Sequence, residues 1–420
     1  MQEHPVLGQV ALGYSPVIDR QRNVVATRLT VFPEQADGTP DAAALLRALA
    51  EVWPPEADGQ PLRLRPHPLD PVPAGAAAKD APLCLNLAGE AMLRAVAQAA
   101  PGPHLMLEVP AFMAADREFS ARLAQLHEAG TVLVLKGQPL APLPPELLGL
   151  FGHAIVEAGS ERRAAPPVPP GLRKVTTVQA GAQGNAEVDA AFQRGAVAVL
   201  GWPWDEAQAL TSSRASVPSD INTVMELING VEREEPVARL EAVLRRDPTL
   251  AFRLMRYLNS PAFGLSVEIN SFGHALMMLG HQRLKRWLAL LLVSSAKGAN
   301  CKPVMYAAVR RGLLMEELGR NQGDAETRGE MFICGVFSLL DRLLQQPLPE
   351  LLRNVPVPER VQQALCDGGG PYGAPLALVR AIEQESRFDI RERAEPLLLG
   401  PAAVNRALLA ALRAARQLDG

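Results

Sequence analysis

The side chains that most often do chemistry in proteins are few in this sequence and far apart. Four cysteines are present, and no two of them form a CxxC pair: Cys84, Cys301, Cys334 and Cys366. His274 and His281 flank one predicted helix end, with no pair of carboxylates nearby. Because a structural zinc site needs several Cys or His ligands at short spacing, we expect no metal here. The cysteines are expected to be reduced and mostly buried, and the histidines to pack or cap.

Other motifs that could carry a reaction are incomplete. Gly368-Gly369-Gly370 has neither the preceding strand nor the Lys-Ser/Thr pair of a phosphate-binding loop. Ser212-Ser213 and Cys84 have no neighbouring residues that would make them nucleophiles. The residues alone therefore predict no catalytic group and no bound cofactor.

Composition describes a chain that is long enough for two cores. Its 420 residues are 48% hydrophobic and 21% charged, and 37 of them are proline. The most apolar stretch, Trp287 to Ala296, is too short to cross a bilayer and follows a basic cluster. The opening Met-Gln-Glu-His-Pro does not have the pattern of a secretory signal. We expect a cytoplasmic protein that does not interact with membranes.

Charge is distributed unevenly between the two halves. Residues 1–210 carry 16 basic and 22 acidic side chains, whereas residues 211–420 carry 26 basic and 23 acidic ones. This asymmetry favours two structural units. The excess of positive charge in the second half is far below that of a nucleic-acid binder, so no nucleic-acid partner is expected.

The first half alternates short apolar runs with helical patterns. This alternation predicts an α/β fold, and seven or eight parallel strands suggest a barrel. The runs are Val24–Phe32, Leu83–Leu87, Leu105–Val109, Thr131–Leu135, Ala154–Val156, Lys174–Val178 and Ala196–Leu200. Apolar residues at helical spacing predict helices over Gly89–Ala99 and Arg117–Ala129. The proline-rich segments Trp53–Pro82 and Ala164–Pro170 are expected to be loops or linkers.

The strand patterns stop near Ala207–Ser219, and the rest of the chain is predicted to be helical. We therefore place an α/β domain at 1–205 and an all-helical domain at 206–420. Asp247-Pro248 is a helix start with proline in the first turn. A helix beginning at Ser271 is expected to end at Gly280. The following helix is predicted to bury its apolar face, and the basic cluster at its start, Arg283, Lys285 and Arg286, to be solvated.

Part of this helical half resembles a known family. The stretches RRDPTLAFRLMRYLNSPAFGL and INSFGHALMMLGHQRLKRW resemble the HDOD domain, over about residues 210–400. The motif positions that carry the resemblance are Asp247, Pro248, Asn259, Ser260, Pro261, Gly264, His274 and Gly280. The resemblance implies an all-helical regulatory module of bacterial signalling proteins. It also implies the fold of the HD phosphohydrolases without their metal ligands.

The residues at the metal-binding positions of the HD family are consistent with the loss of metal ligands. The His-Asp pair of the metal-binding relatives falls at Ser338-Leu339, and an upstream ligand histidine would fall near Ala307. Asp341 alone supplies neither the number nor the geometry of ligands for a metal. We expect this site to be filled by ordinary core packing.

The first half resembles a second family. Tyr14 to Gln21, YSPVIDRQ, is similar to the RQPIFDRQ opening of EAL domains, the barrel phosphodiesterases of cyclic-di-GMP, and the resemblance covers roughly residues 8–204. The Glu that names the family falls at Arg28, whereas Asn86 and Glu108 match two family ligands. The family's paired aspartates fall at Lys136-Gly137.

Further family positions are also lost. The catalytic Lys falls near Glu157, the next Asp near Gly159, and the closing Gln-Gly reads Leu200-Gly201. The family's late Glu has no counterpart in residues 174–179. A hard cation takes about six oxygen ligands, and two retained ones cannot recruit it. Asn86 and Glu108 are therefore expected to cap strand ends and bond backbone amides.

These observations predict a non-catalytic bacterial signalling protein that acts by binding proteins not yet identified. Two alternatives stay open: a receptor that binds cyclic-di-GMP without cutting it, and a residual phosphodiesterase. A receptor should retain phosphate contacts. The best candidate, Arg20, lies in an opening where Tyr14-Ser15 replaces the family's Arg-Gln.

Overall fold

The structure is a computed structural model. It describes residues 4–35, 38–54, 82–102, 105–139, 143–159, 175–204, 219–244, 246, 280, 284–286, 288–293, 300–321, 323–353 and 357–418. Most of both proline-rich segments lies outside these residues, as do His281, Arg283, Trp287 and the helix predicted from Ser271. The motif positions that lie outside are Asp247, Pro248, Asn259, Ser260, Pro261, Gly264 and His274.

Two compact units make up the chain. The first contains the described residues of 1–206 together with 380–413, and the second those of 207–379 with 414–418. The sequence analysis assigned all of residues 206–420 to one helical domain. The structure differs, because residues 380–413 pack with the barrel.

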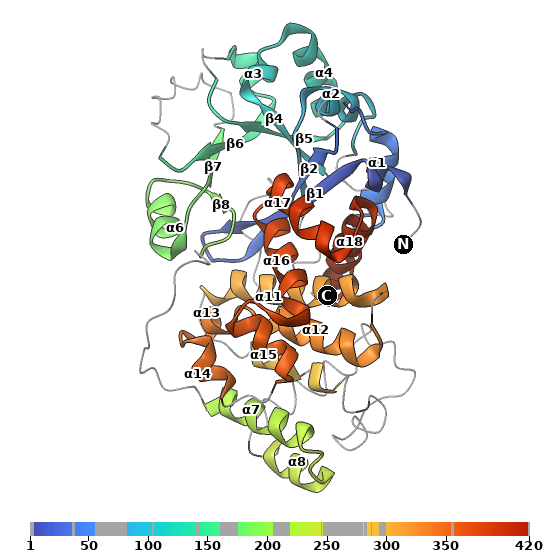
Figure 1. Cartoon of the computed structure of the whole chain (residues 1–420). Coiled ribbons are helices and arrows are strands. Elements are labelled where there is room, and N and C mark those ends of the chain that lie inside the picture. Colours follow the sequence, from blue (N-terminus) through green and yellow to red (C-terminus); the bar gives the residue numbers. More distant parts are fainter. Residues whose placement is uncertain are drawn as a thin grey trace. The chain divides into compact units, whose positions relative to one another are not determined.

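The first unit is a closed barrel with strand order β1 to β8 (Figure 1). Its strands are β1 Val10–Asp19, β2 Val24–Pro33, β3 Leu83–Leu87, β4 Leu105–Pro110, β5 Val132–Lys136, β6 Phe151–Glu157, β7 Thr176–Ala180 and β8 Ala198–Leu200. The predicted α/β barrel is thus confirmed, and β2 to β8 run parallel. β1 was not predicted as a strand, and it pairs antiparallel with both β2 and β8.

Short helices precede the first strand of the barrel and connect later ones. They are η1 Pro5–Gly8, α1 Ala42–Ala50, α2 Glu90–Gln98, α3 Ala111–Ala114, α4 Arg117–Glu128, α5 Pro145–Leu148 and α6 Gly184–Gln193. Asp41 and Asp116 cap α1 and α4, since each side chain accepts a hydrogen bond from a backbone N–H of the first turn. Alternate strand residues such as Met106, Val134 and Val178 fill the interior with aliphatic side chains.

The C-terminal segment completes this unit. It comprises the end of α16 (Gly370–Glu383), α17 (Arg387–Ala394), η5 (Glu395–Leu397) and most of α18 (Pro401–Leu418), drawn in red in Figure 1. On α18, the Asn405 amide donates to the carbonyls of Leu7 and Val10 at 2.8 and 2.6 Å. Its oxygen accepts from the N–H of Leu12 at 3.0 Å. One buried side chain therefore satisfies three backbone groups at the start of β1.

The second unit is helical. Its elements are α7 Ser219–Glu232, α8 Val237–Leu244, α11 Cys301–Leu318, η4 Gly319–Asn321, α12 Ala325–Phe337, α13 Leu340–Leu344, α14 Leu348–Leu352 and α15 Glu359–Cys366, with the first part of α16. Leu284, Leu288 and Leu292 are fully buried, which confirms the predicted apolar face. Gly280 has a φ of 71°, the left-handed conformation expected at a helix C-cap.

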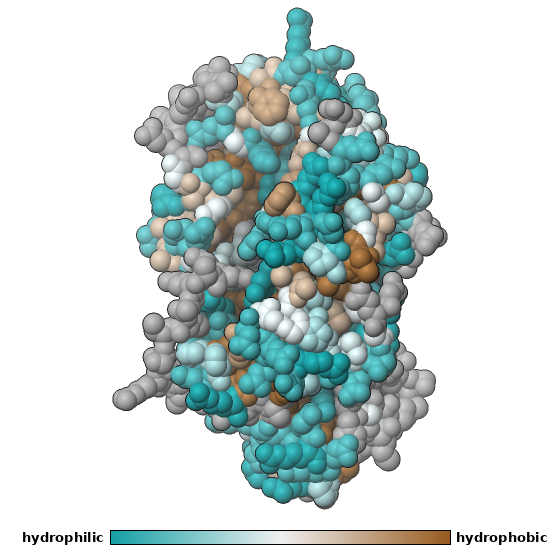
Figure 2. All heavy atoms as spheres, in the orientation of Figure 1, coloured by the Kyte–Doolittle hydropathy of each residue, from teal (hydrophilic) through white to brown (hydrophobic). Residues whose placement is uncertain are grey.

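The face drawn in Figure 2 is mostly hydrophilic, with separate apolar areas. Three large apolar side chains of the described residues are exposed: Phe112, Phe388 and Leu398. Among the described residues, no single helix is long and apolar enough to cross a membrane, although the bent pair Arg387–Leu397 and Pro401–Leu418 passes that test by length and composition.

Candidate functional site

The mouth of the barrel gathers the residues singled out in the EAL comparison. Arg28 on β2, Asn86 on β3, Glu108 on β4 and Lys136 on β5 come from four consecutive parallel strands. Their side chains bond one another, as the distances below show. The carboxyl ends of parallel barrel strands are the usual place for a functional site.

Arg28 and Glu108 form a buried two-pronged ion pair. Arg28 Nε and Nη2 donate to the two carboxylate oxygens of Glu108 at 2.7 and 2.8 Å. The Glu108 side chain has no exposed surface, and that of Arg28 is 11% exposed. Such a fork places both oxygens of the carboxylate on one cation. The arginine at the position of the family's Glu therefore occupies the carboxylate that the chain has retained.

Asn86 is engaged on both sides of its amide. Lys136 Nζ donates to its Oδ1 at 2.9 Å, and its Nδ2 donates to Thr30 Oγ1 at 3.0 Å. We expected Asn86 and Glu108 to bond backbone amides. That prediction was wrong in detail, because their partners here are side chains, including a cation in each case.

A third charged group enters from the C-terminal segment. Arg28 Nη1 donates to Glu385 Oε2 at 2.8 Å, and Ser15 Oγ donates to Glu385 Oε1 at 3.1 Å. Two residues before Glu385, at the last residue of α16, the backbone carbonyl of Glu383 accepts a hydrogen bond from Trp202 Nε1 at 2.9 Å. The mouth is thus built by residues more than 350 positions apart in the chain.

Close backbone approach fixes this turn. A Cβ atom on Gly13 of β1 would lie 2.9 Å from the Cα of Glu385 and 3.0 Å from the carbonyl oxygen of Ile382. Only glycine allows β1 and the end of α16 to come this close.

The pKa values in the mouth are shifted by burial and by the sharing of one cation, Arg28, between two carboxylates. Burial lowers the pKa of Arg28, but the charges of Glu108 and Glu385 outweigh it and hold the pKa above its usual range. Burial raises the pKa of Glu385, and the opposing effect of Arg28 does not cancel that rise. Burial, with the neighbouring Glu108, also raises the pKa of the Cys84 thiol, whose Sγ lies 3.4 Å from Glu108 Oε1. Cys84 is therefore a protonated core residue.

The residues present do not fit the divalent metal that the EAL resemblance implies. Both oxygens of Glu108 are held by Arg28, and the oxygen of Asn86 is held by Lys136. A metal ion would have to displace two cations and would then face them at short range, where like charges repel strongly. We therefore derive no chemical step through a metal at this mouth.

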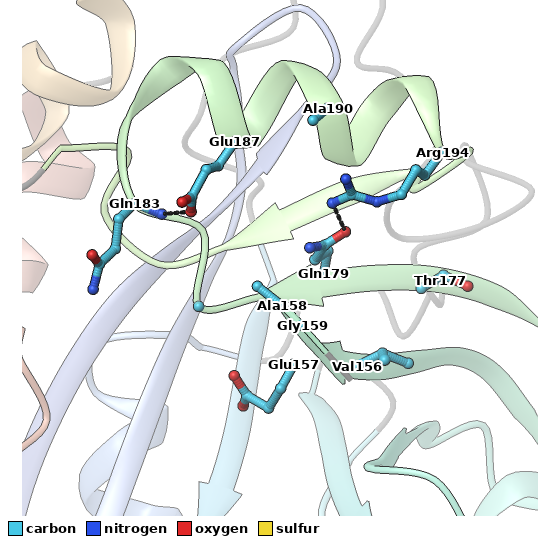
Figure 3. Close-up of a pocket in the computed structure, with 11 residues that line it drawn as sticks. Val156, Glu157, Ala158, Gly159, Thr177, Gln179, Gln183, Glu187, Ala190 and Arg194 are labelled. Atoms are coloured by element: carbon cyan, nitrogen blue, oxygen red, sulfur yellow. Dashed lines mark hydrogen bonds between the residues drawn. The ribbon is translucent and has the colours of Figure 1, made fainter. Parts of the chain in front are cut away.

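A second concavity lies where β6 and β7 end, beside α6 (Figure 3). Its volume is about 750 Å³. The family-position residues Glu157 and Gly159 line it, whereas Arg28, Glu108 and Lys136 do not. Arg194 donates to Gln179 at 2.9 Å across its floor. The Glu187 carboxylate accepts from the N–H of Gln183 at 2.6 Å and is in this way tied to its own helix.

Arg20 does not reach the mouth. It follows β1 at the turn into β2, and the register pairs the start of β1 with the end of β2, so this turn lies at the opposite end of the barrel. Its guanidinium donates to the backbone carbonyl of Phe192 at 2.9 Å. The suggestion that Arg20 contacts a phosphate at the mouth was wrong.

A buried arginine contacts the HD position of the helical unit. Ser338 ends α12 and Leu339 precedes α13, so these two residues lie at a break between helices. Arg311 on α11 is 1% exposed, and its Nη1 donates to Ser338 Oγ at 3.1 Å. Ala307, one turn before Arg311, is fully buried. A buried cation thus lies where the resemblance would place metal ligands, rather than the purely apolar filling that we expected.

Glycines let α11 and α12 cross closely beside this arginine. A Cβ atom on Gly335 would lie 2.5 Å from the carbonyl oxygen of Arg311. We expect Gly335→Ala to destabilise the helical unit by about 1–3 kcal/mol, because backbone atoms cannot yield as a side chain can. Urea denaturation checks this, with Gly369→Ala as the control, since a Cβ at Gly369 meets nothing within 4 Å. Equal stability of the two variants would contradict the close crossing.

The basic cluster of the helical unit is not simply solvated. Lys285 pairs with Glu232 and Arg286 with Glu316, each at 2.5 Å. Arg286 also lies over the ring of Phe332, with its guanidinium carbon 4.2 Å from the ring centroid. The expectation of free, hydrated cations was wrong for these two residues. A small cleft of about 230 Å³, lined in part by Lys285, Glu326 and Phe337, lies beside them.

Three important residues were missed in the sequence analysis: Glu385, Asn405 and Arg311. Glu385 follows a helix in a left-handed conformation with a φ of 54°, a position usually taken by glycine. Nothing in its local sequence pointed to a partner on β2. Arg311 directly precedes an apolar run, GLLM, and an arginine beside such a run was the one signal open to sequence reasoning.

Comparison with known proteins assigns the helical unit. Residues 216–350 match the model of the HDOD domain. The chain therefore contains an HDOD domain, preceded by a closed α/β barrel.

Two curated relatives match part of the chain. The uncharacterized protein YuxH of Bacillus subtilis is 33% identical over 165 residues, 38% of this chain and 40% of that protein. The cyclic di-GMP phosphodiesterase CdgJ of Vibrio cholerae is 28% identical over 151 residues, 36% of this chain and 35% of that protein. The matched segments thus span less than half the length of either relative.

Solved structures show weaker similarity. A putative phosphohydrolase from Shewanella amazonensis is 15% identical with a TM-score of 0.35, covering 48% of this chain and 94% of that one. The PaMucR phosphodiesterase in complex with c-di-GMP is 17% identical with a TM-score of 0.28, covering 46% of this chain and 89% of that one.

Proposed function

We propose that this protein is a non-catalytic member of cyclic-di-GMP signalling that acts by binding other proteins. The observation that carries the proposal is the set of ion pairs in the barrel mouth. Arg28 holds Glu108 through two hydrogen bonds and Glu385 through a third. An HDOD domain in the same chain as a barrel, and a relative named as a cyclic di-GMP phosphodiesterase, support the signalling context.

Loss of catalysis follows from the requirements of phosphodiester hydrolysis. A metal-dependent site must hold cations with oxygen ligands and use them to activate water. In this mouth the acid and the amide already bind the chain's own cations, Arg28 and Lys136. In the HDOD domain, Arg311 bonds the serine at the position of the metal-binding histidine. Both domains have therefore replaced ligand chemistry with fixed internal contacts.

The first test is hydrolysis of cyclic-di-GMP by the purified full chain with Mg²⁺ or Mn²⁺, followed by chromatography of the products. We expect no linear product above the rate without protein, while an active EAL phosphodiesterase assayed in parallel gives turnover. Metal-dependent turnover that is lost in Glu108→Gln would contradict the proposal.

Calorimetry distinguishes the proposed function from the remaining alternative, a receptor that binds cyclic-di-GMP without cutting it. Cyclic-di-GMP titrated into the wild type with Mg²⁺ is expected to give no binding heat. Micromolar binding without hydrolysis would instead identify a cyclic-di-GMP receptor. That result would contradict the proposal that binding other proteins is the main activity.

Protein binding is tested with a substitution in the HDOD domain, made in the full chain. A partner captured by cross-linking the full chain should bind the purified protein at a fixed stoichiometry. Its affinity should fall at least tenfold in Glu326→Arg, which reverses a charge at the small cleft beside Lys285, and stay unchanged in Gln98→Ala on the barrel. A partner that is equally sensitive to both changes would contradict binding through this domain.

A further inference from the structure

The carboxylate of Glu385 is held in the barrel mouth in the way that a ligand is held. One oxygen accepts from Arg28 at 2.8 Å and the other from Ser15 at 3.1 Å, and the Thr30 side chain also bonds this carboxylate. Ser15 and Thr30 are 4% and 2% exposed. The donors all belong to β1 and β2, whereas the acceptor belongs to the C-terminal segment.

A guanidinium and two hydroxyls aimed at one point form a donor set for a carboxylate. Arginine binds planar oxyanions with directed N–H groups, and serine and threonine hydroxyls supply further donors. The same guanidinium uses its other two nitrogens for Glu108. The Arg28 fork is therefore fixed in place whether or not Glu385 is present, and its Nη1 remains directed at the Glu385 position.

The backbone at Glu385 indicates what the side chain contributes. The residue lies just after α16 with a φ of 54°, where glycine is the least strained choice. Its N–H and that of Ser386 bond back to the carbonyls of Ile382 and Ala381, which is the pattern of a helix that ends in such a cap. The turn itself needs no carboxylate. The function of a glutamate here is to fill the donor set.

The fit is incomplete, so the carboxylate can be displaced. Arg28 balances only one of the two acids it contacts, and the pKa of Glu385 is raised by burial and, to a smaller extent, by the negative charge of Glu108. The charged and titratable groups that face Glu385 are Arg28, Glu108 and, through Glu108, Cys84. A carboxylate that is held by three hydrogen bonds but shares its counter-ion with a second carboxylate is displaced by a competing carboxylate more easily than one in a complete ion pair.

We propose that the barrel mouth is a carboxylate-binding site whose resident ligand is Glu385, and that an acidic side chain of a partner protein competes for the same donors. This inference rests on the proposed function, because it treats the mouth as a binding surface rather than a catalytic one. It identifies the partner's chemistry as an acidic peptide segment. It also makes the docked C-terminal segment a competitor of that partner.

Chemical rescue tests the site directly. In the full chain, Glu385→Gly removes the carboxylate and keeps the left-handed turn. Sodium acetate at millimolar to molar concentration should then raise the Tm of this variant progressively relative to sodium chloride at equal ionic strength, because a ligand that binds only the folded state stabilises it. The wild type, whose site is filled, should show no difference between the two salts.

Matched variants make the outcome specific. Gln345→Gly changes another non-glycine residue with a φ of 54°, at the end of α13, and should show no acetate effect. The double variant Glu385→Gly with Ser15→Ala should require several-fold more acetate for the same rise in Tm. If Glu385→Gly does not fold, Glu385→Asn, which tolerates the same turn with a shorter side chain, takes its place in the same titration.

The results separate the two proposals. Acetate effects that are equal in wild type, Glu385→Gly and Gln345→Gly, or absent from all three, would overturn the carboxylate site and leave the hydrolysis result untouched. Turnover of cyclic-di-GMP by the wild type would overturn the non-catalytic function without changing the rescue.

Discussion

Replacing Arg28 with methionine should destabilise the barrel unit by about 3–5 kcal/mol, the usual effect of removing one partner from a buried ion pair. Methionine keeps much of the volume of the side chain but leaves Glu108 and Glu385 facing each other without a cation. The Glu108 side chain has no exposed surface through which water could compensate its charge. Guanidinium denaturation, followed by circular dichroism and by tryptophan fluorescence, measures the loss.

The matched control changes charge without removing the cation. Glu385→Gln keeps one acceptor oxygen, for Arg28, places its NH2 group beside the Ser15 hydroxyl, which can accept from it, and removes the excess negative charge of the cluster. It should therefore be at least as stable as the wild type at neutral pH. A Glu385→Gln variant as unstable as Arg28→Met would contradict the view that one cation serves two acids.

The sign of the pH dependence follows from the raised pKa of Glu385. A carboxyl with a higher pKa in the folded state stabilises the fold fully below its unfolded pKa, and this contribution is lost as pH rises through the folded pKa. The stability of Glu385→Gln relative to the wild type should therefore increase as pH rises from the acidic range toward neutrality. A constant difference over that range would argue against a buried, ionised Glu385.

Asn405→Ala should lower the free energy of unfolding by about 3 kcal/mol, because three buried hydrogen bonds are lost and each contributes about 1 kcal/mol net. The amide bonds the carbonyls of Leu7 and Val10 and the N–H of Leu12, and its side chain is buried. Denaturation of the full chain gives the loss in stability, and amide hydrogen exchange at Leu12 should speed up.

An exposed residue of the same helix supplies the control. Gln417 is an exposed residue of α18, and Gln417→Ala should change the free energy of unfolding by less than about 0.5 kcal/mol. Unchanged exchange at Leu12 in Asn405→Ala would show that α18 does not hold the start of β1.

Periodicity and chain breaks were enough to predict most of the barrel. β3 was predicted at its observed limits, and β4, β5 and α4 within one residue at each end, because apolar runs bounded by glycine, proline and polar residues mark buried parallel strands. β1 was missed. Its run contains Gly13, Ser15 and Pro16, which lower strand propensity, and its place is decided by pairing with β2 and β8 instead.

The domain limits could not be predicted from local patterns. Residues 380–413 are helical like those before them, and their packing on β1 depends on Asn405 and on the space at Gly13. Contacts that join positions nearly 400 residues apart leave no mark in a sequence read alone. A helical period predicts a buried face but not what the face packs against.

The site could be predicted in part. The cations at Arg28 and Lys136 led to the expectation that metal ligands had been replaced, and in the structure these cations bond Glu108 and Asn86, the two residues that the resemblance matched to family ligands. The third group, Glu385, could not be foreseen, since its role depends on a helix end brought back from the far end of the chain. The buried Arg311 was missed for another reason, because a helical pattern does not show that an arginine is buried and bonded to a serine 27 positions later.

The measurement that tests the central claim most directly is a crystal structure of the full chain grown with Mn²⁺ and cyclic-di-GMP, with anomalous scattering used to locate manganese. We predict that Arg28 remains bonded to Glu108 and Glu385, and that no anomalous peak lies beside Asn86. A manganese ion bound by Asn86 and Glu108, with Arg28 and Glu385 displaced from the mouth, would contradict the account.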